Sequence, residues 1–140
     1  MSAAAFVLDC SVAMAWLFHD EATPKTTALL NRLATETALV PAWWSIEITN
    51  VLAMAERKGR ITQAQSDAFI ADLSKIGIER DNEAPERAFT HLLPLCRRHR
   101  LTSYDAIYLD LAIRRSLPLA TLDDDLRREA RKLGVNLLVS

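Results

Sequence analysis

Short, continuously apolar runs alternate along the chain with longer stretches in which apolar residues recur every three or four positions. A short apolar run predicts a strand that is buried on both faces, and the longer spacing predicts a helix with one buried side. The predicted strands are residues 4–8, 38–40, 76–79, 117–122 and 135–139. The predicted helices are residues 11–18, 24–33, 45–58, 62–74, 85–99, 102–115 and 124–133.

Local signals support several of these boundaries. Pro24 suits the first turn of a helix, and Thr62 with Gln65 three residues later matches a capping box. Gly59 stands where a helix C-terminus favours glycine, and Pro41 ends the second apolar run. Strands separated by helices predict an α/β fold of three layers, with a short parallel sheet of about five strands and helices on both faces. Such sheets bind ligands at the carboxyl ends of their strands.

The composition is that of one ordinary globular domain, which we expect to span residues 1–140. Half of the 140 residues are apolar (50%) and 25% are charged, so intrinsic disorder is excluded. The formal net charge of −1 excludes a strongly basic protein that coats DNA. Residues 1–96 carry 8 Lys/Arg and 12 Asp/Glu, whereas residues 97–140 carry 9 and 6. A weakly basic end on an acidic body permits contact with nucleic acid without requiring it.

The cysteines and the apolar segments favour a cytoplasmic protein. Cys10 and Cys96 form no CxxC pair and are too few for a disulfide framework, so a reduced compartment is expected. The N-terminal apolar run has no basic leader and is interrupted by Asp9, which argues against a signal peptide. No run approaches the roughly 20 apolar residues of a membrane span, so we expect no membrane partner.

Two aspartates follow predicted strands and are expected at one edge of the sheet. Asp9 ends the first apolar run and Asp123 ends the fourth, so their carboxylates should lie close together if these strands are neighbours. Helix capping is the ordinary explanation for either residue alone. The presence of both shifts the interpretation towards a functional site.

Two further carboxylates share helix faces with inward-facing residues. Glu47 has Asn50 and two apolar residues on its face, which is unusual for a solvent-facing glutamate, although compensation of the helix dipole explains it equally well. Asp105 shares its face with Tyr108 and other apolar residues, which points it inward. Thr102 with Asp105 also matches a capping box, and this remains the simpler alternative.

Four inward-facing carboxylates at one sheet edge would repel one another strongly. A divalent cation removes that repulsion, and a site made of oxygen ligands selects a hard ion, Mg or Mn, over zinc. Such an ion lowers the pKa of a bound water and holds a phosphate oxygen in place. The chemistry that fits best is metal-assisted hydrolysis of phosphodiesters.

Three segments of the chain resemble the PIN-domain family, namely VLDCSVAMAWL, VPAWWSIEITNVLAMAERKGRI and LTSYDAIYLDLAIRRSLPLATLDDDLRREARKLGV. Within that family they look most like the VapC toxins of bacterial VapBC toxin–antitoxin pairs. The resemblance runs from about residue 6 to residue 139, and the order and spacing of the segments make it specific. It implies a small parallel sheet flanked by helices, and a Mg- or Mn-dependent endoribonuclease with a pocket of three or four acids.

The resemblance also implies roles for individual residues. The family's acids fall on Asp9, Glu47, Asp105 and Asp123. The three aspartates would bind the metal, and the glutamate would reach it directly or through water. The supporting polar residues of the family pattern match Ser11, Asn50 and Thr121. The pattern often has glycine where this chain has Arg100 and Ser116, a departure that concerns loop geometry and not the acids.

The resemblance implies partners as well. The expected reaction is attack by a metal-activated water on RNA, which leaves a 5′-phosphate and a 3′-hydroxyl. A homodimer and a VapB-type antitoxin are expected, with DNA contacted only through the antitoxin. Antitoxins of this family lay a helical tail into an apolar groove and cover the acidic pocket.

Tryptophans and arginines are the remaining candidates for binding. Trp43 and Trp44 could stack RNA bases or, with Trp16, line the antitoxin groove, and buried core is the competing interpretation. Asp110, with Arg114 four residues later, has the spacing of a surface ion pair. The candidate phosphate contacts are the basic run Arg97, Arg98 and Arg100, because this run leads into the Asp105 segment.

Three other functions remain open from the sequence. A PIN nuclease in RNA processing, or one acting on structured DNA, would use the same acids. A receiver-like signalling domain would use Asp81 as its phosphoryl acceptor, but the last predicted strand ends without the lysine that such a domain needs. A catalytically silent binding module is disfavoured by the intact acids.

Overall fold

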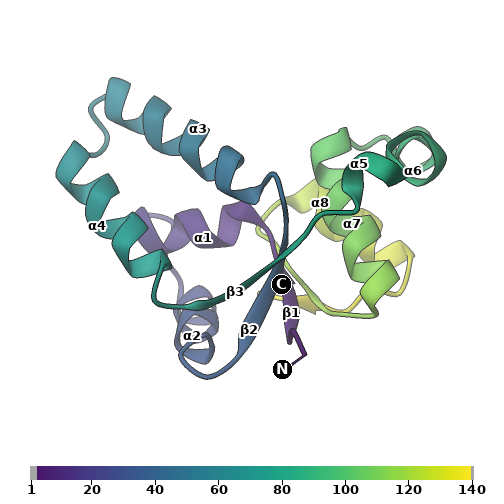
Figure 1. Cartoon of the computed structure of the whole chain (residues 1–140), viewed down its shortest axis with the longest axis horizontal. Helices are drawn as coiled ribbons and strands as arrows, with labels where there is room; N and C mark the ends of the chain where they lie inside the picture. Colours follow the sequence, from purple (N-terminus) through teal and green to yellow (C-terminus); the bar gives the residue numbers. More distant parts are fainter. Residues whose placement is uncertain (1–2, 140) are drawn as a thin grey trace.

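A computed structural model describes residues 3–139, and five parallel strands form its single sheet (Figure 1). The strands are β1 (Phe6–Leu8), β2 (Thr37–Pro41), β3 (Gly77–Asp81), β4 (Leu119–Ala120) and β5 (Leu137–Leu138). Their order across the sheet is β3-β2-β1-β4-β5. The predicted parallel sheet is therefore confirmed, and the order of its strands is new information.

Helices flank the sheet and complete the predicted three-layer α/β fold. In the view of Figure 1, α1–α4 lie to the left of the central strands and α5–α8 lie to the right. The helical segments are α1 (Cys10–Leu17), α2 (Pro24–Arg32), α3 (Trp44–Arg57), α4 (Gln63–Leu73), α5 (Ala84–Arg87), the π-helical turn η1 (Ala88–Leu92), α6 (Leu93–His99), α7 (Ser103–Arg115) and α8 (Asp124–Lys132).

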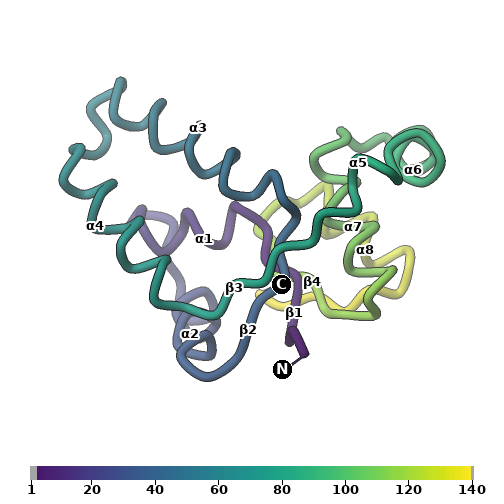
Figure 2. The backbone as a smooth tube through the Cα atoms, in the orientation of Figure 1, coloured from purple at the N-terminus to yellow at the C-terminus, as the bar shows by residue number. Residues whose placement is uncertain are grey.

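The first strand occupies the centre of the sheet and sets the position of the site. Val7 is in register with Leu39 of β2 on one side and with Leu119 of β4 on the other, and Figure 2 shows β1 and β4 running together. The backbone N–H of Asp9 donates to the carbonyl of Ala120 at 3.0 Å. The segments that follow β1 and β4 therefore start side by side, which meets the condition under which Asp9 and Asp123 were expected to lie close together.

The core is apolar on both faces of β1, whose three residues are all fully buried. Leu109 and Leu111 of α7 and Leu126 of α8 are also fully buried in the same core cluster. Each such side chain contributes roughly 1.5–3 kcal/mol through removal of its surface from water. Within residues 3–139, no helix combines the length and the apolar character needed to cross a bilayer.

Three predicted elements differ most from those observed, and one of them is the strand 135–139, which shrinks to Leu137–Leu138. The predicted helix 85–99 is interrupted by the π-helical turn η1, because Pro94 has no N–H with which to continue the α-helical bonding pattern. The predicted strand 117–122 shrinks to the two residues of β4. Here the carbonyl of Thr121 accepts a hydrogen bond from the Arg127 side chain at 2.9 Å, so the chain leaves the ladder after Ala120.

Candidate active site

The four candidate carboxylates all stand at the N-terminal ends of helices. Asp9 and Asp123 are the N-cap residues of α1 and α8, and Glu47 and Asp105 lie in the first turns of α3 and α7. Three of these helices follow β1, β2 and β4, which are neighbours in the sheet. The partial positive charge of helix N-termini offsets part of the repulsion between carboxylates at this edge.

Asp9 is buried, and two hydroxyl groups hold its carboxylate. Its Oδ2 accepts hydrogen bonds from Ser11 Oγ at 2.7 Å and from Thr121 Oγ1 at 2.6 Å. Burial raises the pKa of Asp9, the two hydroxyls oppose that change, and the charge of Asp123 adds to it. The Asp9 side chain makes no capping hydrogen bond to α1, so capping does not explain this residue.

The same two hydroxyls also connect Asp9 to the segment before α8. Ser11 Oγ accepts from the N–H of Leu122 at 3.0 Å, and Thr121 Oγ1 accepts from the N–H of Asp123 at 3.1 Å. The two supporting residues that the sequence pattern singled out thus bind Asp9 and the backbone around Asp123 at once. They join the two strand ends into one rigid edge.

Glu47 is held by a residue that sequence reasoning did not assign. The hydroxyl of Tyr108, a side chain only 1% exposed, donates to Glu47 Oε1 at 2.7 Å. Burial raises the pKa of Glu47, the Tyr108 hydroxyl opposes this, and the charges of Asp9 and Asp105 add to it. The inward face shared by Tyr108 and Asp105 was visible in the sequence, but the partner of the phenol hydroxyl was not.

Asp105 and Asp123 complete the group of acids. Burial and then the charges of Asp123 and Asp9 raise the pKa of Asp105 to about 6. Asp123 Oδ1 accepts the N–H of Leu126 at 2.8 Å, and Thr102 Oγ1 accepts the N–H of Asp105 at 3.2 Å. The predicted helix capping is therefore confirmed for Asp123 and for Thr102. Asp123 caps its helix and also belongs to the acidic group.

The thiol beside this group is inert. Burial, followed by the charges of Glu47 and Asp9, raises the pKa of Cys10 to about 12. A thiol with that pKa stays protonated and is a poor nucleophile. Cys10 is also part of the buried hydrophobic core.

The four acids offer carboxylate oxygens, which are the ligands that a hard divalent ion such as Mg²⁺ prefers. In the part of the chain that the structure describes, no three His, Cys, Asp or Glu side chains lie close enough to hold one ion together. The resemblance implies Asp9, Asp105 and Asp123 as metal ligands, and this assignment stays a prediction. Mg²⁺ is commonly bound by one or two carboxylates and several waters. Burial first, and then the charge of neighbouring carboxylates, raises the pKa values of Asp9, Glu47 and Asp105, and a bound cation would offset both penalties.

A cavity of about 590 Å³ adjoins the acids on the side of Glu47, and we name it the Glu47 cavity. Its walls include Trp43, Ile46, Glu47, Asn50 and Val51 from the start of α3, and Tyr104 from α7. Asn50 is exposed. Asn50 thus lines the same cavity as Glu47, and the supporting role that the family pattern gives it stays a prediction.

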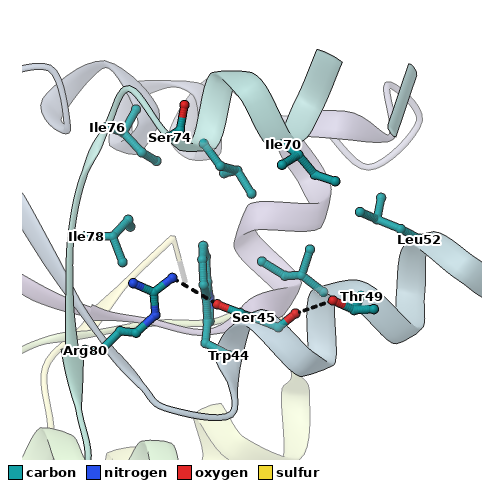
Figure 3. A pocket seen from close by; sticks show the side chains of 11 residues that line it. Trp44, Ser45, Thr49, Leu52, Ile70, Ser74, Ile76, Ile78 and Arg80 are labelled. Carbon is teal, nitrogen blue, oxygen red and sulfur yellow. Dashed lines mark hydrogen bonds between the residues drawn. The ribbon is translucent and has the colours of Figure 1, made fainter. Parts of the chain in front are cut away.

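The three tryptophans do not share one groove. The Trp16 indole donates to the carbonyl of Thr26 at 2.8 Å, and Trp43 lines the Glu47 cavity. Trp44 is 3% exposed and contributes to the wall of a different groove between α3, α4 and β3 (Figure 3), which we name the α3–α4 groove. Burial as core, the competing interpretation of these residues, holds for Trp44.

The basic run lies at the end of α6, shortly before the segment that carries Asp105. Arg97, Arg98 and Arg100 are all exposed around the C-terminal end of α6. Arg98 lines a cavity with His91 and Asp110 that includes none of the four acids. Their role as phosphate contacts stays a prediction.

The expected ion pair of Asp110 with Arg114 is present but buried, and Asp81, the residue of the receiver-like alternative, is also engaged by an arginine. Asp110 is buried, and its main partner is Arg87, which donates two hydrogen bonds at 2.7 and 2.8 Å, while Arg114 lies 3.7 Å away. Asp81 is buried and accepts two hydrogen bonds of 3.0 Å from Arg114. A carboxylate engaged in this way is not available as a phosphoryl acceptor, so the receiver-like alternative loses its key residue.

Three comparisons with known proteins found matches to this chain. The model of the PIN domain family matches residues 6–132. Two proteins named Ribonuclease VapC3, from Mycobacterium tuberculosis strains CDC 1551 / Oshkosh and ATCC 25618 / H37Rv, are each 30% identical over 104 residues, which cover 74% of this chain and 73% of theirs. The crystal structure of PAE2754 from Pyrobaculum aerophilum matches with a TM-score of 0.71 at 23% identity, covering 96% of this chain and 83% of that chain.

The structural likeness to PAE2754 supports the fold, and the other two comparisons go further. The family model spans the chain from β1 to α8 and includes all four acids. The VapC3 ribonucleases align over most of the length of both chains. This chain therefore belongs to the PIN-domain family, among its VapC-type members.

Proposed function

We propose that this protein is a nuclease toxin that hydrolyses RNA phosphodiesters with Mg or Mn as cofactor. The observation that carries the proposal is the sheet edge where Asp9, Glu47, Asp105 and Asp123 gather at four helix N-termini and influence one another's charge. The likeness to the VapC3 ribonucleases supports RNA as the substrate class.

The roles of the residues follow from their hydrogen bonds. Ser11 and Thr121 fix Asp9, and Asp9 with Asp105 or Asp123 would hold the ion. A bound Mg²⁺ or Mn²⁺ supplies a water of lowered pKa and neutralises charge on the phosphate. Glu47, anchored through Oε1 by Tyr108, keeps Oε2 to bind a water or accept its proton.

An antitoxin helix is the proposed occupant of the α3–α4 groove. The groove holds about 470 Å³, and Figure 3 shows isoleucines of α4 and of the β3 segment facing α3 across it. Ile70 in its wall is 52% exposed, and Arg80 at the β3 side donates to Ser45 Oγ at 3.1 Å. An apolar groove with a polar end suits an amphipathic helix.

Further parts of the proposal come from the family resemblance. A VapB-type antitoxin neutralises the protein and alone connects it to DNA. The toxin is a homodimer and acts in the cytoplasm. Arg97, Arg98 and Arg100 contact phosphates of the substrate.

Cleavage of a pool of structured RNAs tests the proposal. The purified protein is incubated with the pool in Mg²⁺, in Mn²⁺ and in EDTA, beside Asp105→Asn and the matched control Asp124→Asn. Asp124 also lies in a first helical turn, but its side chain is 94% exposed and pairs with Arg127.

We expect cutting that needs the metal, disappears in Asp105→Asn and persists in Asp124→Asn. Cutting that survives EDTA and Asp105→Asn alike would contradict the proposed chemistry. A parallel pool of structured DNA separates an RNA-specific toxin from a PIN nuclease of broader substrate range.

A further inference from the structure

The Glu47 cavity has features that the proposed hydrolysis leaves unused. Two aromatic side chains line it from separate elements, with Trp43 at the start of α3 and Tyr104 in the first turn of α7. Tyr104 is 57% exposed and Ile46 is 64% exposed, so this apolar wall faces solvent in the isolated chain. A volume of about 590 Å³ lies within the range of about 300–1,000 Å³ that is usual for small-ligand sites.

The same wall carries one uncommitted polar group. Within residues 3–139, the side-chain amide of Asn50 has no hydrogen-bond partner in the protein. An amide offers two donor hydrogens and an acceptor oxygen, which match the edge of a nucleobase. Aromatic faces together with one amide are the combination by which proteins bind an unstacked base.

The cavity is continuous with the proposed reaction site, because Glu47 lines the cavity and also belongs to the acidic group. A nucleotide whose phosphate lies at the acids would therefore place an adjacent base within reach of the cavity. We propose that the Glu47 cavity is a subsite for one unpaired nucleobase of the RNA substrate, with Trp43 and Tyr104 as stacking surfaces and Asn50 as hydrogen-bond partner.

This inference rests on the proposed function and refines its substrate class. A base inside a duplex is stacked and paired, so only single-stranded or looped RNA offers one at low cost. A protein side chain is the competing occupant. We favour the base because the cavity opens beside the acids and its wall carries the Asn50 amide. The helix of a protein partner is instead proposed for the α3–α4 groove, which is a separate apolar surface.

Tryptophan fluorescence tests the subsite without any cleavage. Oligo(A) and oligo(U) are titrated in EDTA into the wild-type protein and into Trp43→Phe, Trp43→Ala, Tyr104→Ala and Asn50→Ala. Trp44 is 3% exposed and Trp16 bonds to a backbone carbonyl, so Trp43 is the indole that a base can quench. Trp16→Phe controls for the signal, and Phe89→Ala removes an 85% exposed aromatic side chain that does not line the cavity.

We expect quenching that Trp43→Phe abolishes and Trp16→Phe leaves intact. Loss of one stacking surface in Trp43→Ala or Tyr104→Ala should weaken affinity roughly 5- to 150-fold. Affinity measured with a labelled oligonucleotide should persist in Trp43→Phe and Phe89→Ala, and duplex RNA should bind more weakly than the single strand. Melting curves identify any alanine variant that fails to fold. In that case Trp43→Phe provides the test, because it should lose the fluorescence quenching and keep its affinity for the oligonucleotide.

Equal affinity for oligo(A) in all folded variants, or equal affinity for duplex and single-stranded RNA, overturns the inference. Variants that bind RNA normally but lose affinity for the antitoxin assign the cavity to a protein partner and also overturn it. In Mg²⁺, the subsite predicts a raised KM with an unchanged kcat for Tyr104→Ala. Absence of all cleavage by the wild-type protein, with quenching intact, overturns the nuclease proposal and leaves the subsite standing.

Discussion

Asp9 is a buried carboxylate whose two hydroxyl partners, Ser11 and Thr121, come from the segments that follow two different strands, β1 and β4. The sequence predicted Asp9 as a site residue from its place after an apolar run, and the family pattern added both hydroxyl residues. Their joint attachment to one oxygen depends on the pairing of β1 with β4, which no local pattern reveals. The hydrogen bond from the Tyr108 hydroxyl was not predicted either, because its partner Glu47 is 61 residues away along the chain.

Replacement of Asp105 by asparagine should stabilise the metal-free protein above neutral pH. Because burial and neighbouring carboxylates raise the pKa of Asp105 from 3.8 to about 6, its charged form destabilises the folded state. This penalty is absent below the unfolded value of 3.8 and complete above about pH 6. After allowance for solvent screening it amounts to about 1 kcal/mol.

Thermal melting in EDTA measures this effect. Asp105→Asn should melt about 2–4 °C above the wild-type protein near pH 7.5, and the difference should shrink towards pH 5. Asp124→Asn, at an exposed position, should show no such pattern. A difference that does not vary between these pH values would mean that burial and the neighbouring carboxylates do not raise the pKa of Asp105 in the folded protein.

Tyr108→Phe should separate the support of Glu47 from the stability of the core. The ring stays buried, and only the hydroxyl that donates to Glu47 Oε1 is lost. A hydrogen bond to a charged group contributes about 1.5–3 kcal/mol, so we expect kcat for RNA cleavage to fall at least about tenfold. Steady-state kinetics in Mg²⁺ check this, and unchanged kcat in a folded variant would exclude a positioning role for Tyr108.

Helix α7 shows what sequence reasoning achieves for one element. The predicted range 102–115 agrees with the observed Ser103–Arg115, because a capping threonine and a regular apolar face mark the helix. Helix 85–99 was predicted less well, since a π-helical turn before a proline leaves no separate sign in the apolar pattern. The two departures from family glycines lie on either side of α7, at Arg100 and Ser116, and both residues adopt the left-handed conformation with φ of 53°.

Ser116→Gly should stabilise the protein without changing its activity. The C-cap of α7 has φ 53° and ψ 46°, a region where a side chain costs about 1 kcal/mol relative to glycine. We expect the free energy of unfolding in urea to rise by about that amount, with RNA cleavage unaltered. Ser116→Ala retains the Cβ atom and should bring no gain, so equal stability of the glycine and alanine variants would contradict this explanation.

At the scale of the whole molecule, strand order turns scattered residues into a site. The apolar pattern predicted parallel strands, but only the order β2-β1-β4 brings Asp9, Glu47 and Asp123 to one edge. Different residues of α3 line the α3–α4 groove and the Glu47 cavity, so the surface proposed for the antitoxin differs from the surface proposed for the base. The tryptophans could not be divided between these surfaces from sequence, because Trp43 and Trp44 are adjacent along the chain.

The ends of the RNA fragments provide the most direct test of the central claim, that carboxylates at this edge direct water onto an RNA phosphodiester. Fragments produced in Mg²⁺ by the wild-type protein are analysed by mass spectrometry, beside those from Asp105→Asn. We expect 5′-phosphate and 3′-hydroxyl ends from the wild-type protein and no fragments from Asp105→Asn. Fragments with 2′,3′-cyclic phosphates, or identical fragments from Asp105→Asn, would contradict it.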